Sequence, residues 1–148
     1  MPTWVKILLI VAGLLVVLSL AAAGLGVYLW REHGRGFVES AQKTVDEGRE
    51  YGKHTDSKGC LDEGLARHTR AQGFGEIIGT NVFLRSCLDA ARPAPGFCDA
   101  VPRQLEFIRS AQWQQQQCQK HGLTMEKQCG QLFSQVQKYC EVRRLVRD

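Results

Sequence analysis

The six cysteines are the residues of this sequence best suited to chemistry, and one of them begins a possible metal site. The segment CQKHGLTMEKQC, from Cys118 to Cys129, opens with the spacing Cys118-x-x-His121, which looks like half of a zinc site. A structural zinc site takes four ligands, usually supplied as two close pairs. No second close pair follows, and the other histidines are not clustered with cysteine. The sequence therefore predicts no metal ligands.

Thiol chemistry is the second possibility for these cysteines. Reactive dithiols are close pairs whose pKa values are lowered at a helix N-terminus, and a haem attachment site reads Cys-x-x-Cys-His. None of the six cysteines forms Cys-x-x-Cys. An even number of cysteines at this density is typical of structural disulfides in an oxidising compartment. The sequence thus favours disulfide bonds and predicts no bound cofactor.

Turn signals suggest how the cysteines pair. One pair flanks the turn RPAPG and another flanks HGLT, each nearly equidistant from its turn. Such positions come abreast in an antiparallel helical hairpin, within the Cα separation that a disulfide needs. Six cysteines allow 15 pairings, so the connectivity is a hypothesis. The predicted bonds are Cys87–Cys98, Cys118–Cys129 and Cys60–Cys140.

Other catalytic constellations are missing from the sequence. No serine lies in a G-x-S-x-G context, and neither a P-loop nor a G-x-G-x-x-G follows a strand. Glu63 and His68 are five positions apart, which is a poor spacing for sharing a helix face. His68 lies in an otherwise apolar stripe, so we interpret it as a core or boundary histidine. These observations predict a protein that is not an enzyme, with no catalytic residues.

An apolar segment near the N-terminus predicts a transmembrane helix over residues 7–30. Ser19 is its only clearly polar side chain, and it carries no charge. As a helix it would be about 36 Å long, against a hydrocarbon core of about 30 Å. Trp4 and Tyr28 lie near its ends, where amphipathic rings prefer the membrane interface. The lipid bilayer is therefore an expected partner of residues 7–30, preceded by a short tail over residues 1–6.

A cleaved signal peptide is the alternative for this segment. Ala21-Ala22-Ala23 would be an acceptable cleavage site, but the apolar run continues past it to Trp30. A signal h-region usually stops after about 7–15 residues, so we favour an uncleaved signal anchor. The pair Ala22-x-x-x-Gly26 is a weak signal for a homodimer through the transmembrane helix.

Two rules disagree on the orientation of this anchor. Lys6 is the only charged side chain before the span, whereas Arg31, Arg35, Lys43 and Arg49 follow it. The positive-inside rule would keep the following domain in the cytoplasm. The cysteines favour an oxidising compartment, and long domains translocate largely regardless of their charge. We therefore expect a periplasmic or extracellular domain.

The net charge is only +4, and acidic and basic residues are mixed along the chain. A nucleic-acid-binding surface would concentrate basic residues, so the sequence does not predict one. One local excess lies in the tail EVRRLVRD, with Arg143, Arg144 and Arg147. These cations suit a helix C-terminus, where they meet the negative end of the helix dipole. A patch for a partner or for lipid headgroups is the alternative.

The remaining chain predicts an all-α fold, with a polar hinge over residues 31–36 and an extracytoplasmic helical domain over residues 37–148. Four to five short helices are expected in an antiparallel bundle. The first carries a stripe of small residues that includes Val45 and Gly48, which favours close packing or a marginal helix. The expected helices cover residues 37–52, 60–72, 76–92, about 99–120, and 125 to the C-terminal region.

Several residues should mark the ends of these helices. Asp56 or Ser57 can cap the second helix, and Asp99 can cap the fourth, with Pro102 in its first turn. Gly122 suits the C-terminal cap of that helix. Thr124 can cap the last helix, which has the clearest apolar stripe. This stripe comprises Met125, Cys129, Leu132, Phe133, Val136 and Cys140.

Three functions remain open for such a protein. The first is a non-enzymatic interaction or assembly module of the cell envelope, with a protein partner. The second is a domain that binds a small ligand or lipid. The third is an envelope protein of thiol redox or metal handling. The absence of a catalytic or metal-binding pattern favours the first.

Overall fold

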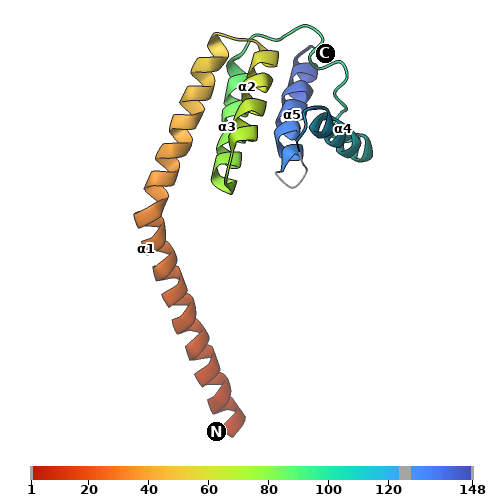
Figure 1. Ribbon diagram of the computed structural model, residues 1–148. Coiled ribbons are helices and arrows are strands. Elements are labelled where there is room, and N and C mark those ends of the chain that lie inside the picture. The colour runs from red at the N-terminus through yellow and green to blue at the C-terminus, as the bar shows by residue number, and fades with distance from the viewer. Residues whose placement is uncertain (1, 124–127, 148) are drawn as a thin grey trace. The chain divides into compact units, whose positions relative to one another are not determined.

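The computed structural model describes residues 2–123 and 128–147. Regular secondary structure in these residues is helical, as the sequence predicted, and one isolated β-bridge joins Asp56 to Arg92. The chain divides into two compact units, Met1–Ser40 and Ala41–Asp148. The helices are α1 (Thr3–Lys53), α2 (Ser57–Arg70), α3 (Phe74–Ala90), α4 (Phe107–Lys120) and α5 (Cys129–Arg147) (Figure 1).

The first unit consists of the N-terminal part of α1 and contains the apolar segment Ile10–Tyr28. This segment has a mean hydropathy of 2.5 and no buried residue, and within the described residues it is the one helix long and apolar enough to cross a membrane. The Ser19 hydroxyl donates to the Leu15 carbonyl at 2.8 Å, so this polar group is satisfied inside the helix. Membrane anchors and signal sequences share these properties.

The backbone of α1 continues through residues 31–36, where the sequence had predicted a polar hinge. That prediction is wrong at the level of secondary structure, and the boundary between the units falls after Ser40. Gly34 and Gly36 favoured the hinge, but a glycine costs a helix only about 1 kcal/mol, and no proline interrupts the segment.

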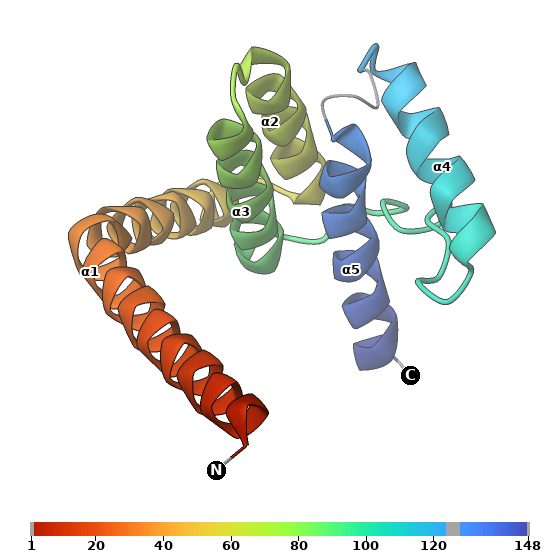
Figure 2. The same cartoon turned by 90° about the horizontal axis from the view of Figure 1, so that it is seen from below.

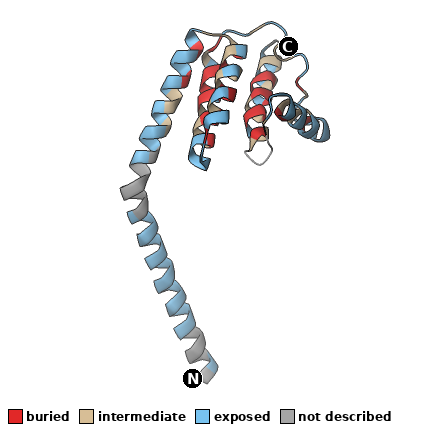
Figure 3. Ribbon diagram, in the orientation of Figure 1, coloured by how far each residue is buried: buried red, intermediate tan, exposed pale blue. Residues whose placement is uncertain are grey.

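The second unit is a bundle in which α3 and α5 hold the centre. Helix α2 packs on α3 and α5, and α4 packs on α5 (Figure 2). Buried positions concentrate in α2, α3 and α5, whereas α4 is mostly exposed (Figure 3). Fully burying a leucine or phenylalanine side chain contributes about 1.5–3 kcal/mol, so the core is the main source of stability. Its largest buried side chains are Phe83, Phe133, Leu84, Leu88, Leu132, His68 and Val136.

The apolar stripe predicted for the last helix is confirmed for its described members. Leu132, Phe133 and Val136 are at most 2% exposed, and the two cysteines of the stripe are fully buried. Met125 lies outside the described residues. The buried position of His68 agrees with its interpretation as a core histidine.

The small-residue stripe of the first predicted helix marks a close contact between α1 and α3. A Cβ added at Gly48 would lie 2.6 Å from the Phe83 carbonyl oxygen, and one added at Gly52 would lie 2.5 Å from that of Cys87. The Tyr51 ring packs on the Phe83 ring, with 5.8 Å between centroids. The two backbones therefore approach at a distance that only glycine permits.

Arg67 joins three helices on the other side of this contact. Its guanidinium donates to Glu47 of α1 at 2.7 Å and to Glu63 of α2 at 2.9 Å, and it lies 3.6 Å from the centroid of the Phe83 ring. The hydrogen bond from Arg67 lowers the pKa of Glu47 below its usual value. This cluster ties the C-terminal part of α1 to the bundle.

Two of the predicted helix caps, Asp56 and Gly122, are formed in the structure. Asp56 is the N-cap of α2, and its carboxylate accepts from the Gly59 backbone N–H at 2.9 Å. Gly122 follows α4 with φ of 66°, and the N–H of Leu123 donates to the Cys118 carbonyl at 2.9 Å, as in a Schellman motif. Thr124, the predicted cap of the last helix, lies outside the described residues.

The fourth helix begins later than predicted, at Phe107. Asp99 does not cap it, and Pro102 precedes it. The carbonyls of Pro102 and Arg103 accept hydrogen bonds from the side chains of Gln137 and Ser110, at 3.1 Å each. Because side chains take these two acceptors, the segment before Phe107 is held in a non-helical conformation.

The disulfides differ from the predicted pairing in two of three bonds. The structure joins Cys118 to Cys129 across HGLT, as expected. It joins Cys60 to Cys87 and Cys98 to Cys140, so the predicted bonds Cys87–Cys98 and Cys60–Cys140 are wrong. RPAPG does not join two helices of a hairpin, because no helix resumes until Phe107. The hairpin turn that matters is Gly73, midway between Cys60 and Cys87 in α2 and α3.

Candidate binding site at the strap end of the bundle

A segment without regular helix connects α3 to α4 and crosses one end of the bundle. We call residues 91–106 the strap and the end where it lies the strap end. The strap holds three of the four prolines of the chain, which prevent it from forming a helix: Pro93, Pro95 and Pro102. A connection of this length is uncommon in a compact domain unless it has a function.

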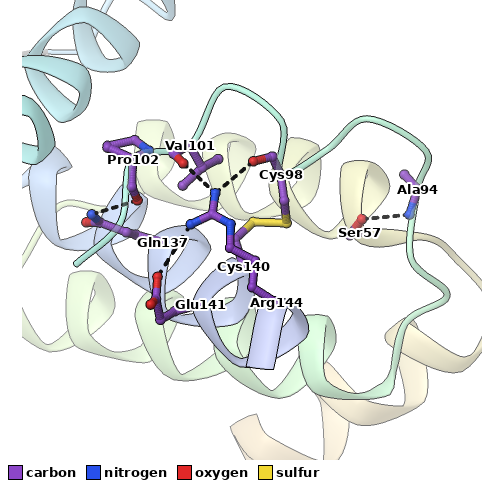
Figure 4. The surroundings of a disulfide bond; sticks show 9 residues. All are labelled: Ser57, Ala94, Cys98, Val101, Pro102, Gln137, Cys140, Glu141 and Arg144. Carbon is purple, nitrogen blue, oxygen red and sulfur yellow. Dashed lines mark hydrogen bonds and ion pairs between the residues drawn. A yellow bond between two sulfur atoms is a disulfide. The ribbon is translucent and has the colours of Figure 1, made fainter. Parts of the chain in front are cut away.

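Side chains from two helices and one disulfide fix the strap along its length (Figure 4). Its start is held by Ser57 of α2, whose hydroxyl accepts from the Ala94 N–H at 2.9 Å. Its middle is held by the Cys98–Cys140 bond to α5. The strap is therefore a preformed surface rather than a loose connection.

Arg144 of α5 fills the inner side of the strap. Its guanidinium donates to the carbonyls of Cys98, at 3.0 Å, and Val101, and it lies 3.4 Å from the Glu141 carboxylate (Figure 4). Charged donors to backbone carbonyls are stronger than neutral ones. This arginine therefore has a structural role. The sequence had treated the three arginines of the basic tail together and did not assign such a role to any one of them.

Gln137 of α5 holds the end of the strap. Its side-chain nitrogen donates to the Pro102 carbonyl at 3.1 Å and to the Ser110 hydroxyl at 2.6 Å, and its oxygen accepts from Gln114 at 3.3 Å. Gln137 is 4% exposed, so these partners satisfy a buried amide.

The chain enters the bundle at the end opposite the strap. Gly48 lies beside Phe83, and Gly52 lies beside Ala90, so α1 runs in the same direction as α3. The strap follows the C-terminal end of α3, whereas Ala41, where the second unit begins, lies toward the N-terminal end of α3. The strap end is thus not the end at which α1 enters the bundle.

Large apolar side chains are exposed at the strap end. Leu105 in the strap is 83% exposed. Phe107 and Ile108 in the first turn of α4 are 75% and 76% exposed. The buried side of α4 contains Ser110 and Cys118 instead. The last turns of α5, at the same end, expose Val142, Leu145 and Val146. Exposed apolar residues gathered at one end are typical of an interaction surface.

A small apolar groove lies between the strap and α5. This proline groove has a volume of about 280 Å³. Its floor includes Tyr139, whose ring meets the Phe97 ring edge-on with 6.0 Å between centroids. The groove is lined by Ser57, Pro93, Ala94, Pro95, Gly96, Phe97, Cys98, Asp99, Tyr139, Cys140, Arg143, Arg144 and Val146.

A larger polar cleft lies between the strap and α4, with a volume of about 550 Å³. We call it the tryptophan cleft, because Trp113 lines it beside Arg103 and Arg109. A hydrogen bond from the Arg103 backbone and an ion pair with Arg109 lower the pKa of Glu106, so this carboxylate is charged at neutral pH. The cleft shares Asp99 and Arg144 with the proline groove, so the two hollows border the same part of the strap.

A third hollow, of about 300 Å³, lies between α3 and α5 on the other side of Tyr139. We call it the basic hollow, because Arg85, Lys138 and Arg143 line it against a single carboxylate, that of Asp89. The three hollows lie close together, because each borders the strap or the C-terminal half of α5.

The zinc half-site suggested by Cys118 and His121 is not formed. Cys118 is bonded to Cys129, and the His121 ring stacks on Phe133 with 5.9 Å between centroids. Within residues 2–123 and 128–147, no group of three or more histidine, cysteine or acidic side chains could hold a metal ion. All six cysteines are engaged in disulfides.

The sequence indicated the basic tail as a possible interaction patch, but it did not predict which residues of the bundle its arginines contact. Arg143 lies over the Tyr139 ring at 5.3 Å from the centroid, and Arg144 holds the strap. The side chain of Arg147 lies outside the described part of the structure. The signal that could have located the site was the cluster of three prolines in the interval before Phe107: Pro93, Pro95 and Pro102.

Comparison with known proteins gives no relative: the chain matches no family model, no curated protein and no solved structure.

The hydroxyl of Tyr139 leads to a first test of this geometry. Tyr139 is 6% exposed, and its hydroxyl has no hydrogen-bond partner among the described residues. Removing an unsatisfied buried group costs little. Tyr139→Phe should therefore lower the free energy of unfolding by no more than about 0.5 kcal/mol, or raise it by up to about 1 kcal/mol. Urea unfolding followed by circular dichroism would measure the change. A loss above about 1 kcal/mol would mean that the hydroxyl is hydrogen-bonded, for example to a buried water.

Proposed function

We propose that the protein is a single-pass membrane protein whose disulfide-stabilised bundle binds a protein partner at the strap end. The observation that carries the proposal is the strap itself, which is fixed at three places and bordered by two hollows that share Asp99 and Arg144. A preformed surface loses little conformational entropy on binding, which favours affinity. No catalytic role is assigned to it.

The disulfides support a location outside the cytoplasm. Three disulfides in a bundle of this size are typical of the periplasm or the extracellular side, and Ile10–Tyr28 is suited to anchor the chain there. The cations that follow the span favour the opposite orientation. We give the disulfides more weight, because a long domain can be translocated largely regardless of its charge, whereas cytoplasmic thiols are kept reduced.

A small-ligand or lipid-binding domain is the second candidate. The apolar proline groove favours it, but ligand sites usually measure about 300–1,000 Å³ and enclose most of the ligand. At about 280 Å³ the proline groove can take only a small apolar group. A side chain presented by a larger partner fits this volume better than a complete lipid.

Photo-crosslinking in native membranes tests the proposal. A diazirine amino acid at Val146 or Phe107, both at the strap end, should give one reproducible protein adduct. The matched control is Phe74, which is 62% exposed at the opposite end of the bundle and should give none. Lipid adducts at Val146 would favour the second candidate. Equal adducts at Phe74, or none at the strap end, would contradict a binding role for this end.

A further inference from the structure

The proline groove and the basic hollow are neighbours. Three residues of α5 line both of them: Tyr139, Arg143 and Val146. We call these residues the ridge. A molecule that lies across the ridge would touch an apolar surface on one side and a basic one on the other.

The two sides of the ridge differ in chemistry. On the strap side, Pro93, Pro95 and Phe97 form an apolar wall. On the α3 side, Lys138 and Arg143 make no ion pair with any described residue. Arg85 is paired with Asp89 at 3.4 Å, and both are exposed, so this pair contributes little. The basic hollow therefore has an excess of positive charge.

Arg143 is held in place without neutralisation of its charge. The Tyr139 ring lies beneath its guanidinium at 5.3 Å, which is within the range of a cation–π interaction. Its neighbour Arg144 donates to two strap carbonyls and to Glu141, so Arg144 is already occupied. Arg143 is thus the cation of the ridge that remains available to a ligand.

We propose that the ridge binds an extended segment of a protein partner with an apolar side chain in the proline groove and an acidic side chain in the basic hollow. This inference rests on the proposed function and names the chemistry of the partner. Side chains at alternate positions of an extended chain project to the same side, so an apolar and an acidic residue two positions apart suit the ridge. The small groove accepts one side chain, whereas an acyl chain needs a longer channel. Asp89 and Asp99 at the borders disfavour a polyanion such as a nucleic acid.

The test uses the full chain in a nanodisc, labelled with ¹⁵N-arginine, and three blocked pentapeptides. Ala-Leu-Ala-Asp-Ala should shift the side-chain Nε–Hε signal of Arg143 with a Kd on the order of 1 mM. Replacing the aspartate of the peptide by asparagine should weaken binding about threefold, as expected for one exposed ion pair. Replacing the leucine by alanine should weaken it about tenfold, because the apolar contact is lost.

A matched pair of variants locates the charge contact. In the Arg143→Gln variant, affinities are followed through the backbone amide signals of Tyr139 and Val146 in a uniformly ¹⁵N-labelled chain, and the difference between the aspartate and asparagine peptides should be abolished. Arg49→Gln, which removes an exposed arginine of α1 that lines none of the three hollows, should leave that difference unchanged. Equal affinity of the unaltered chain for both peptides, or no saturable shift of Arg143, would overturn the proposal.

Three further results separate this inference from the proposed function. The first would be a short-chain anionic phospholipid that shifts the Arg143 signal in the same way with a lower Kd than the peptide. That result would assign the ridge to lipid and overturn the inference. A partner crosslinked at Val146 whose contact segment has no acidic residue near an apolar one would also overturn it, while the proposed function would stand. Peptide binding without any crosslinked protein would contradict the proposed function alone.

Discussion

A chain in which alanine replaces both Cys98 and Cys140 is expected to lose about 4 kcal/mol of its free energy of unfolding. This disulfide spans 42 residues, the longest of the three loops, and the chain-entropy cost of a broken bond grows with loop length. Replacing Cys118 and Cys129, which close a loop of 11 residues, should cost about 3 kcal/mol. Urea unfolding followed by near-ultraviolet circular dichroism would measure both variants.

The same two variants separate stability from binding. Without Cys98–Cys140 the middle of the strap loses its covalent tie, so the protein adduct at Val146 should disappear. The Cys118–Cys129 variant is the control, because its bond lies at the other end of α4 and should leave the adduct in place. Intact mass with and without reductant would check that the remaining cysteines stay paired. Equal adducts in the two variants would show that the strap binds without this disulfide.

Gly52→Ala is expected to lower the free energy of unfolding by about 3 kcal/mol. The added methyl group would lie 2.5 Å from the Cys87 carbonyl oxygen and 3.0 Å from the Ala90 Cβ. Neither neighbour is the end of a flexible side chain, so α1 would have to move away from α3. The midpoint of urea unfolding would report the loss.

Gly79→Ala is the matched control for this prediction. A Cβ at Gly79, in the interior of α3, meets nothing within 4 Å. Alanine should therefore stabilise the helix there by about 0.5–1 kcal/mol. If Gly52→Ala proved as stable as Gly79→Ala, the close packing of α1 on α3 would be wrong.

Local signals in the sequence located most of the helices. The carboxylate of Asp56 and the positive φ of Gly122 mark helix ends through interactions with their own neighbours, so the sequence is sufficient to predict them. The Cys118–Cys129 bond is local in the same sense, because both cysteines flank one turn. The stripe of α5 could be predicted because every described member faces one core.

The other two disulfides depended on knowing which turn joins two packed helices. The rule that cysteines equidistant from a turn come abreast was sound, but it was applied to RPAPG instead of to Gly73. The repeated triplet Cys60-Leu61-Asp62 and Cys87-Leu88-Asp89 was visible in the sequence. Its two cysteines are bonded to each other, so the repeat contained the signal.

The contacts that hold the strap and shape its hollows could not be predicted, because they join segments far apart in the sequence. Leu105 and Ile108 fit a helical stripe, yet the side chains of Gln137 and Ser110 take the backbone acceptors that would begin that helix early. The donor Gln137 is 35 residues from Pro102, and Arg144 is 46 residues from Cys98. Such pairs follow from the tertiary fold, and a periodic pattern contains no information about them.

The tie between Cys98 and Cys140 sets an order for biosynthesis. Cys60 and Cys87 can pair as soon as α3 has been delivered, and they close the first hairpin without later parts of the chain. Cys98 has to wait for α5, which also supplies Gln137 and Arg144. The proposed binding surface is therefore the last part of the bundle to form. A chain interrupted before α5 would have an unpaired thiol at Cys98 and no strap end, so recognition of a partner would be restricted to chains that have finished folding.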